Sequence, residues 1–351
     1  MRLSDPVRRW FWIPAVFLLG AEGCSLHPVR TVVVSAGRLQ ERADVPRLGD
    51  DWGSEGQMAQ AAQGRSICRV KYHPSYRQNR WMVVEGTLGE DRTYPVVLDT
   101  GASPALFVND IHVVDNGLAI HPLDAGGTSS GVGGICVLPR LQIGDIVLLN
   151  WSCFYAQQHP ETQVFGLTIA RDQAIVAGVP ALRKFRYIAF DSINQEVEFS
   201  LRETFDAGRP DAWSQYAFVI EEDLAGNAYL FVEIPIAGEP LRLQLDTGSG
   251  RGLAVAEELW ERIRPRVAHT PLRATKELYP YLGCLDCKRG VVPRLSVGDR
   301  FVTQAQVSVF PDDSPLLEQA AGLLGMQYFQ DTILVLDFQR HRMWVRNVPG
   351  R

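Results

Sequence analysis

The strongest constraint on the fold of this 351-residue chain is an internal repeat. The motif Leu98–Ser103 (LDTGAS) returns as Leu245–Gly250 (LDTGSG), roughly one domain length further along the chain. More matches follow in the same order at a near-constant offset, which indicates a duplicated domain rather than a short solenoid repeat. They are Leu138–Asp145 with Val292–Asp299, Ile175–Gly178 with Gly322–Gly325, and Tyr187–Asp191 with Ile333–Asp337.

The repeat sets the expected domain boundaries. Its two copies occupy residues 66–205 and 215–351, and the polar segment 206–214, which contains Gly and Pro, is expected to link them. Residues 25–65 are polar and have no sustained apolar period, so we expect a flexible tether there. The sequence therefore predicts two lobes of similar size, each built from one copy.

Short strands are expected throughout both copies. From Cys68 onward, brief apolar runs rich in β-branched and aromatic residues are interrupted by Gly, Pro, Asn and Asp. Helical periodicity is confined to short stretches near 180–184, 256–263 and 316–321. The fold class is therefore predicted to be all-β with few short helices.

Composition and missing motifs exclude several classes of function. With 46% hydrophobic residues, the chain can bury a sizeable core and is not expected to be disordered. The formal net charge is -5 and no Lys/Arg-rich run occurs, so nucleic-acid binding is not expected. The sequence contains no HExxH motif and no local serine-hydrolase signature, so neither a catalytic metal nor a serine nucleophile is expected.

The duplicated Asp-Thr-Gly motif carries the candidate chemistry. In both copies it follows an apolar strand and opens into a Gly-containing loop, so two facing loops would bring Asp99 and Asp246 together. Two adjacent carboxyl groups share a proton, because their like charges repel when both are ionised. Such a pair can bind a water, with one carboxylate accepting its proton while the other carboxyl donates to a carbonyl oxygen.

With both motifs and the apolar-apolar-Gly elements Val176–Gly178 and Leu323–Gly325, the sequence resembles the pepsin/retropepsin superfamily of aspartic proteases. The resemblance extends over nearly all of residues 80–346 and implies a two-lobed double β-barrel made of two retropepsin-like domains. It implies an aspartic endopeptidase that hydrolyses peptide or protein substrates without a cofactor or metal ion. It assigns Asp99 and Asp246 as the catalytic pair, supported by Thr100, Gly101, Thr247, Gly248 and Ser249.

Some features depart from pepsin-type sequences. The segment Gly126–Gly134, at the expected flap of the first lobe, has no aromatic residue and resembles retropepsin flaps, whereas Tyr279 and Tyr281 occupy the comparable stretch of the second lobe. We therefore expect a bacterial retropepsin-like duplication. Because both aspartates lie on one chain, we expect a monomer. The alternative is an inactive peptide- or envelope-binding lipoprotein on the same fold, since a fold does not establish an activity.

Residues 1–24 resemble a bacterial lipoprotein signal peptide. Arginines precede the apolar run Trp10–Gly20, which is too short to span a bilayer, and small residues lead to Cys24. Glu22 is unusual in such a motif, and an uncleaved anchor is the alternative. Lipidation of Cys24 would anchor the chain to a membrane, and Ser25 lacks the Asp associated with inner-membrane retention. The expected location is the periplasm or cell envelope, as an outer-membrane lipoprotein.

The remaining cysteines leave their pairing open. Cys136 and Cys153 lie on either side of a predicted hairpin, where they could form a disulfide or stay as thiols. Cys284 and Cys287 form a CxxC motif, but no second close Cys or His pair completes a zinc site and no βαβ setting favours a redox pair. A local disulfide or two thiols are the interpretations left for this motif.

Overall fold

The computed structural model describes residues 29–35, 39, 45–46, 48, 56–60, 66–76, 80–123, 132–164, 167–224, 226–279 and 282–346. The predicted signal peptide with Cys24, most of the segment Gly126–Gly134, and Tyr281 lie outside the described residues. Within these ranges, the helices are all too short or too polar to cross a membrane.

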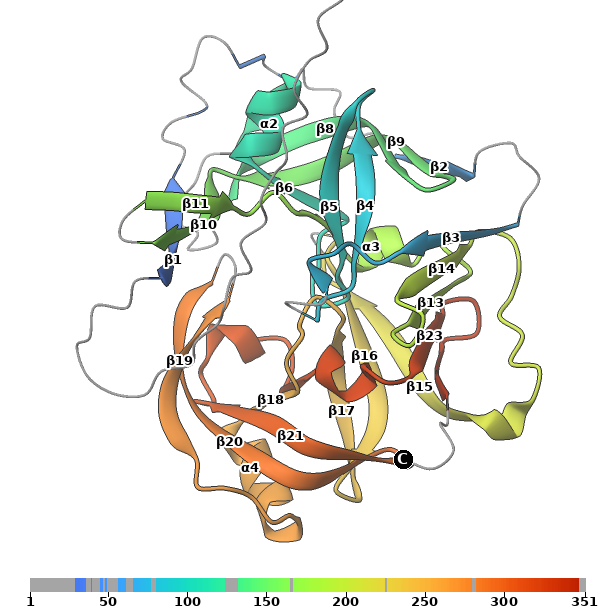
Figure 1. Ribbon diagram of the computed structural model, residues 1–351, viewed down its shortest axis with the longest axis vertical. Coiled ribbons are helices and arrows are strands. Elements are labelled where there is room, and N and C mark those ends of the chain that lie inside the picture. The colour runs from blue at the N-terminus through green and yellow to red at the C-terminus, as the bar shows by residue number, and fades with distance from the viewer. Residues whose placement is uncertain are drawn as a thin grey trace, which may run out of the picture.

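The first lobe is a closed β-barrel (Figure 1). Its strands alternate buried and more exposed positions, as in β9, because successive side chains point to opposite faces of a sheet. The barrel closes where β4 (Val83–Leu88) pairs with β8 (Val132–Ile143). The ring consists of β4 (Val83–Leu88), β5 (Arg92–Leu98), β12 (Ile175–Ala177), β6 (Leu106–Asn109), β9 (Ile146–Ala156) and β8 (Val132–Ile143).

The second lobe repeats this barrel strand for strand. The parallel and antiparallel strand pairings occur in the same order as in the first lobe. The ring closes where β16 (Ala228–Ile236) pairs with β20 (Gly283–Val297). The fold is therefore an all-β double barrel, as predicted. The ring consists of β16 (Ala228–Ile236), β17 (Glu239–Asp246), β22 (Gly322–Gly325), β18 (Leu253–Ala256), β21 (Arg300–Phe310) and β20 (Gly283–Val297).

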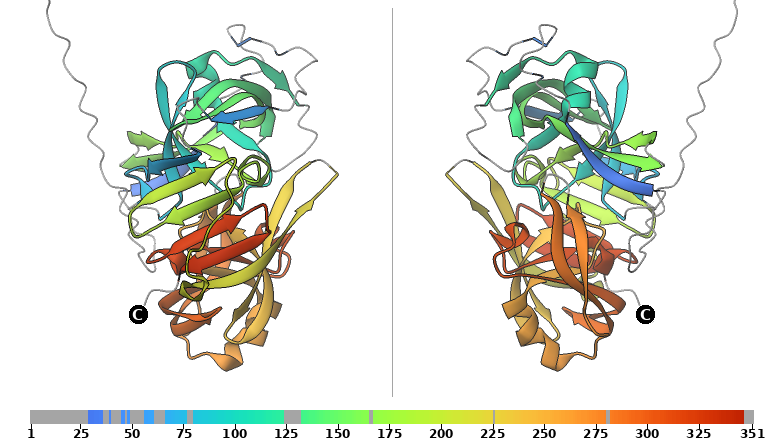
Figure 2. Two further views of the ribbon diagram at one scale, coloured as in Figure 1. Left: turned by 90° about the vertical axis from the view of Figure 1, so that its right-hand side faces the viewer. Right: turned by 90° about the vertical axis from the view of Figure 1, so that its left-hand side faces the viewer.

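A sheet shared by the two lobes joins the barrels. Its central pair is antiparallel β13 with β23, one strand from each lobe, so the two copies meet at equivalent edges. Figure 2 (left) shows this sheet facing the viewer between the lobes. The strand order is β15 (Trp213–Glu222), β24 (Arg342–Arg346), β23 (Ile333–Asp337), β13 (Tyr187–Asp191), β14 (Glu196–Ser200) and β3 (Ile67–Lys71).

The short helices lie close to the predicted stretches, with one exception. α3 (Val179–Leu182), α4 (Glu257–Ile263) and the 3-10 turn η4 (Pro315–Leu317) fall where helical periodicity was expected. Further 3-10 turns are η2 (Pro210–Ala212), η3 (Arg264–Arg266) and η5 (Met326–Phe329). The sequence prediction missed α2 (Asp110–Asn116), whose β-branched residues disfavour a helix and whose formation depends on capping at both ends.

The prediction that residues 25–65 form a flexible tether is wrong for two segments. β1 (Val29–Ser35) pairs along its whole length with β10 (Gln158–Val164), which also pairs with β11 (Leu167–Arg171). β2 (Gln57–Gln60) pairs with the edge of β9. A valine run in β1 has high strand propensity, and sheet edges on the first lobe supply the hydrogen-bond partners that the isolated segment lacks. These segments belong to the first lobe.

The CxxC motif lies within strand β20 rather than in a loop. Cys284 is exposed and Cys287 is buried, because residues three apart on a strand point to opposite faces. The two thiols therefore cannot bond to one another, and the local-disulfide alternative is wrong. Cys136 and Cys153 are directly paired across β8 and β9 with their Sγ atoms 3.1 Å apart, and both are present as thiols.

Candidate active site

The two motif aspartates occupy equivalent positions in the two barrels. Asp99 directly follows β5 and Asp246 ends β17, and each of these strands pairs in parallel with a short apolar strand ending next to a glycine. The N–H of Asp99 donates to Ala177 O at 2.9 Å. Each motif loop thus starts from a strand held inside the barrel wall, which gives the carboxyl groups a rigid origin.

The glycines of the apolar-apolar-Gly elements allow the motif loops to pack on these short strands. A Cβ at Gly178 would lie 2.1 Å from Pro104 O and 2.5 Å from Ala102 O. A Cβ at Gly325 would lie 2.4 Å from Arg251 O. No side chain fits at either position because the loop carbonyls fill the space. The predicted elements therefore support the two motif loops directly.

Threonines connect the two motif loops through reciprocal hydrogen bonds. The N–H of Thr100 donates to Thr247 Oγ1 at 2.9 Å, and the N–H of Thr247 donates to Thr100 Oγ1 at 3.1 Å. The Thr100 hydroxyl donates to Leu245 O, and the Thr247 hydroxyl donates to Leu98 O, both at 2.6 Å. Both threonines are fully buried. Four hydrogen bonds thus fix one motif loop against the other across the interface between the lobes.

This connection places the two carboxyl groups in contact. The carboxyl groups of Asp99 and Asp246 meet at Gly101, where an ideal Cβ would lie 2.8 Å from Asp246 Oδ1 and 3.0 Å from Asp99 Oδ1. The Gly101 N–H donates to Asp99 Oδ1 at 2.7 Å, and a Cβ at Gly101 would lie 2.8 Å from Asp246 Cγ. A Cβ at Gly248 would lie 2.3 Å from Asp99 Cγ. Each motif glycine therefore lets the backbone approach a carboxyl group of the other lobe.

The environment of the pair favours a single shared proton. Burial and the adjacent charge of Asp99 raise the pKa of Asp246 well above its usual value. Burial also raises the pKa of Asp99, but backbone N–H groups, including that of Gly101, oppose the shift. Both residues keep part of their surface exposed, so water can reach them. The two carboxyl groups therefore titrate as a pair that shares one proton, and the rise in pKa is larger for Asp246 than for Asp99.

The structure brings together all seven residues singled out in the two motifs. The Ser249 hydroxyl accepts the Arg251 N–H at 3.3 Å, and the Ser249 N–H donates to the backbone carbonyl of Asp246 at 3.3 Å. In the described parts of the chain, no cluster of three or more His, Cys, Asp or Glu side chains is arranged to hold a metal ion.

Sequence reasoning did not single out Arg251 or Glu277. The side chain of Arg251, in the loop after Asp246, is ion-paired with that of Glu277 on β19 (Arg273–Tyr279). Arg251 could have been found from the sequence because it lies in the motif loop. Glu277 could not, because nothing in the local sequence indicates that β19 packs on that loop.

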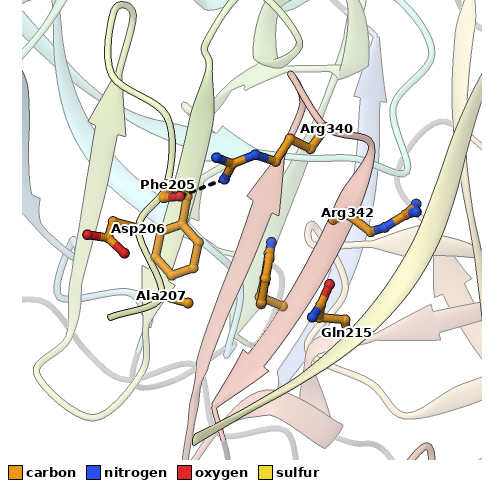
Figure 3. Close-up of a pocket in the computed structure, with 7 residues that line it drawn as sticks. Phe205, Asp206, Ala207, Gln215, Arg340 and Arg342 are labelled. Atoms are coloured by element: carbon orange, nitrogen blue, oxygen red, sulfur yellow. Dashed lines mark hydrogen bonds between the residues drawn. The ribbon is translucent and has the colours of Figure 1, made fainter. Parts of the chain in front are cut away.

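A surface hollow of about 500 Å³ lies away from the pair Asp99 and Asp246, which we call the dyad (Figure 3). It sits beside the shared sheet, where an Arg340 N–H donates to Phe205 O at 2.7 Å. None of the seven motif residues lines it. Its lining is Phe205, Asp206, Ala207, Gln215, Arg340, Arg342 and Trp344.

No protein-family model matches the sequence, and no curated protein matches it. Among solved structures, an aspartic proteinase from Irpex lacteus is similar over 81% of this chain and 98% of its own, with 10% identity and a TM-score of 0.44. The basic 7S globulin from soybean is similar over 80% and 94%, with 13% identity and a TM-score of 0.43. A retropepsin-like aspartic protease from Rickettsia conorii is similar over 38% and 95%, with 13% identity and a TM-score of 0.24.

Proposed function

We propose that the chain is an aspartic-type endopeptidase with Asp99 and Asp246 as its catalytic pair. One observation carries the proposal: two carboxyl groups from equivalent loops touch one another and are fixed by reciprocal threonine hydrogen bonds. An arrangement that places like charges in contact destabilises the fold at neutral pH, so it is more readily explained by chemistry than by stability.

The proposed reaction is direct attack of water on a peptide carbonyl. Ionised Asp99 takes a proton from a water molecule held by both carboxyl groups, and the water oxygen bonds to the carbonyl carbon. Protonated Asp246 donates its proton to the carbonyl oxygen, giving a neutral tetrahedral diol. As the C–N bond breaks, Asp99 gives its proton to the departing amine and Asp246 takes a proton from one diol hydroxyl. The products are an amine and a carboxylic acid, and the dyad is again singly protonated. No covalent enzyme intermediate forms.

Peptide or protein substrates in an extended conformation suit this site. The scissile carbonyl must lie next to both carboxyl groups, so the chain on either side of it would meet one lobe and then the other. An extended peptide can use its backbone N–H and C=O groups for binding, which leaves side-chain contacts to set specificity. Anchoring through Cys24, location in the cell envelope and a monomeric state stay predictions from the sequence.

The test is cleavage of a random peptide library by the full chain between pH 4 and pH 7, with products identified by mass spectrometry. We expect internal cleavage by the wild type and a loss of about 10³-fold in Asp99→Asn and Asp246→Asn, because each removes a proton-transfer group. Asp211→Asn, in the exposed linker, is the matched control and should keep full activity. Circular dichroism would verify that each variant is folded.

Two results would contradict the proposal. Full activity in both dyad variants would show that other residues do the chemistry. A folded wild-type chain that cleaves nothing over the whole pH range would instead favour the alternative of a peptide-binding protein on a protease-like fold.

A further inference from the structure

The loop that carries Asp246 is joined to strand β19 by a buried ion pair. A guanidinium nitrogen of Arg251 contacts the Glu277 carboxylate, and another donates to Leu278 O at 3.2 Å. The guanidinium carbon lies 4.6 Å from the centre of the Tyr279 ring, which is the distance of a cation–π contact. Arg251 is thus held in one orientation by three neighbouring residues of β19.

The charged cluster formed by Arg251, Glu277 and Arg289 carries more positive than negative charge. Glu277 is almost completely buried, and it also accepts hydrogen bonds from Arg289 Nε at 2.8 Å and Ser308 Oγ at 2.6 Å. Burial alone would raise the pKa of Glu277, but the charge of Arg251, the Ser308 hydroxyl and Arg289 lower it, so the carboxylate is ionised. One anion therefore faces two cations, which leaves a net positive charge. The Arg251 side chain keeps 33% of its surface exposed.

The cluster lies beside the dyad. Arg251 follows Asp246 in the same loop. Burial raises the pKa of Tyr279, the charge of Arg251 opposes this rise, and the charges of Glu277 and Asp246 add to it. Figure 1 and the right-hand view of Figure 2 show the β19–β20 hairpin rising from the second lobe toward the first, on the side opposite the shared sheet.

The motif loop of the first lobe, which the structure describes in full, has no charged residue at the position equivalent to Arg251. Counting along the motif loops, Pro104 stands where the second lobe has Arg251. Its carbonyl packs on Gly178, and a proline side chain carries no charge. The two described motif loops therefore differ: the Asp246 loop carries a fixed cation at a position where the Asp99 loop carries no charge.

We propose that Arg251 is a specificity-determining residue that binds an acidic side chain of the peptide substrate on the Asp246 side of the scissile bond. The proposal deepens the proposed function and rests on it. A substrate carboxylate would balance the excess charge of the cluster and accept charge-assisted hydrogen bonds from a guanidinium that is already oriented. The contacts with Glu277, Leu278 O and the Tyr279 ring hold the guanidinium in this orientation.

The test compares peptides that differ only in Asp or Asn at one position, with that position moved along the peptide. For one position on a single side of the scissile bond, we expect the wild type to show a kcat/KM about five- to tenfold higher for Asp than for Asn. Arg251→Gln should reduce this ratio to about one. Arg251→Lys should keep part of the preference because it keeps the charge.

Arg242→Gln is the matched control. Arg242 lies on the same strand as Asp246 but is half exposed and paired with Glu221 at the surface, so its loss should leave the Asp/Asn ratio unchanged. If Arg251→Gln does not fold, the double variant Arg251→Gln/Glu277→Gln removes both charges of the pair and should show the same loss of preference.

A binding measurement separates this proposal from the proposed function. Fluorescence anisotropy of labelled Asp and Asn peptides on Asp99→Asn should give the same preference, with the same dependence on Arg251, without any cleavage. A wild type that cleaves peptides with no Asp preference at any position, or with a preference that survives Arg251→Gln, would overturn the subsite and leave the endopeptidase standing. Binding without cleavage by the wild type would support the subsite and reject the endopeptidase.

Discussion

The two lobes share a barrel and equivalent strands of the central sheet, but they differ in the peripheral strands and in the charges next to the motif loop. In both, the strand that leads to the motif aspartate is paired in parallel with the apolar strand before a glycine, and the order of strand pairings is the same. Only the first lobe carries the added strands β1, β2, β10 and β11. Among the described residues, only the second lobe has an ion pair, between Arg251 and the buried Glu277, next to its motif loop.

This difference shows which contacts the dyad depends on. The geometry that joins the carboxyl groups comes from reciprocal contacts across the interface, so a change in one copy would have to be matched in the other. The peripheral strands and the ion cluster contact one lobe only, and each copy could change there independently. The central site is therefore nearly symmetric, while its surroundings are not.

The largest stability effect is expected at the two threonines. Thr100→Val and Thr247→Val each remove a hydroxyl that accepts one hydrogen bond and donates another, leaving a buried N–H and a buried carbonyl unpaired. Each should lower the free energy of unfolding by about 2–4 kcal/mol, because each buried unpaired group is costly. Denaturant unfolding measures the loss, and Thr→Ser at either position should restore most of it. A clearly unequal loss would show that the two halves of the connection do not act as a symmetric pair.

A smaller loss is expected at the glycines that support the motif loops. Gly178→Ala and Gly325→Ala would each place a Cβ within 2.4 Å or less of a loop carbonyl oxygen. The loops must shift to accommodate it, at about 1–3 kcal/mol in each lobe. Thermal unfolding measures this loss, and kcat measures the accompanying displacement of the dyad. Wild-type stability and activity in both variants would contradict the tight packing under the loops.

The smallest expected change in stability is the pH-dependent one at the two aspartates, and it should differ between Asp99 and Asp246 because their pKa shifts differ. The pKa of Asp246 is raised above its unfolded value, so its contribution to stability is complete below the unfolded pKa and is lost as pH rises through the folded pKa. Asp246→Asn should therefore be more stable than the wild type at pH 7, and the difference should shrink toward pH 4. Asp99→Asn should show the same trend more weakly, because its N–H donors stabilise the anion. Melting temperatures across this range test the order, and a difference independent of pH would contradict it.

Much of the fold followed from local patterns because the duplicated chain repeats its strand signals. Alternating apolar runs predicted the barrel strands, and α4 was indicated by its periodicity. The helix α2 was missed because its sequence favours a strand and only its caps reverse that preference. The strand β1 was missed because its partner β10 lies far along the chain, and a short edge strand forms only when such a partner exists.

The sequence by itself determined the duplication, the all-β class and the identity of the paired aspartates. Each of these follows from short sequence patterns, namely the apolar runs and the Asp-Thr-Gly motif, that occur twice in the same order. Only the tertiary structure decided that the two carboxyl groups meet, that burial and the charge of Asp99 raise the pKa of Asp246, and that Arg251 in the same loop is fixed by Glu277. The physical reason is that charge and burial depend on neighbours in space. The residues that set them come from different strands and, at the dyad, from different lobes.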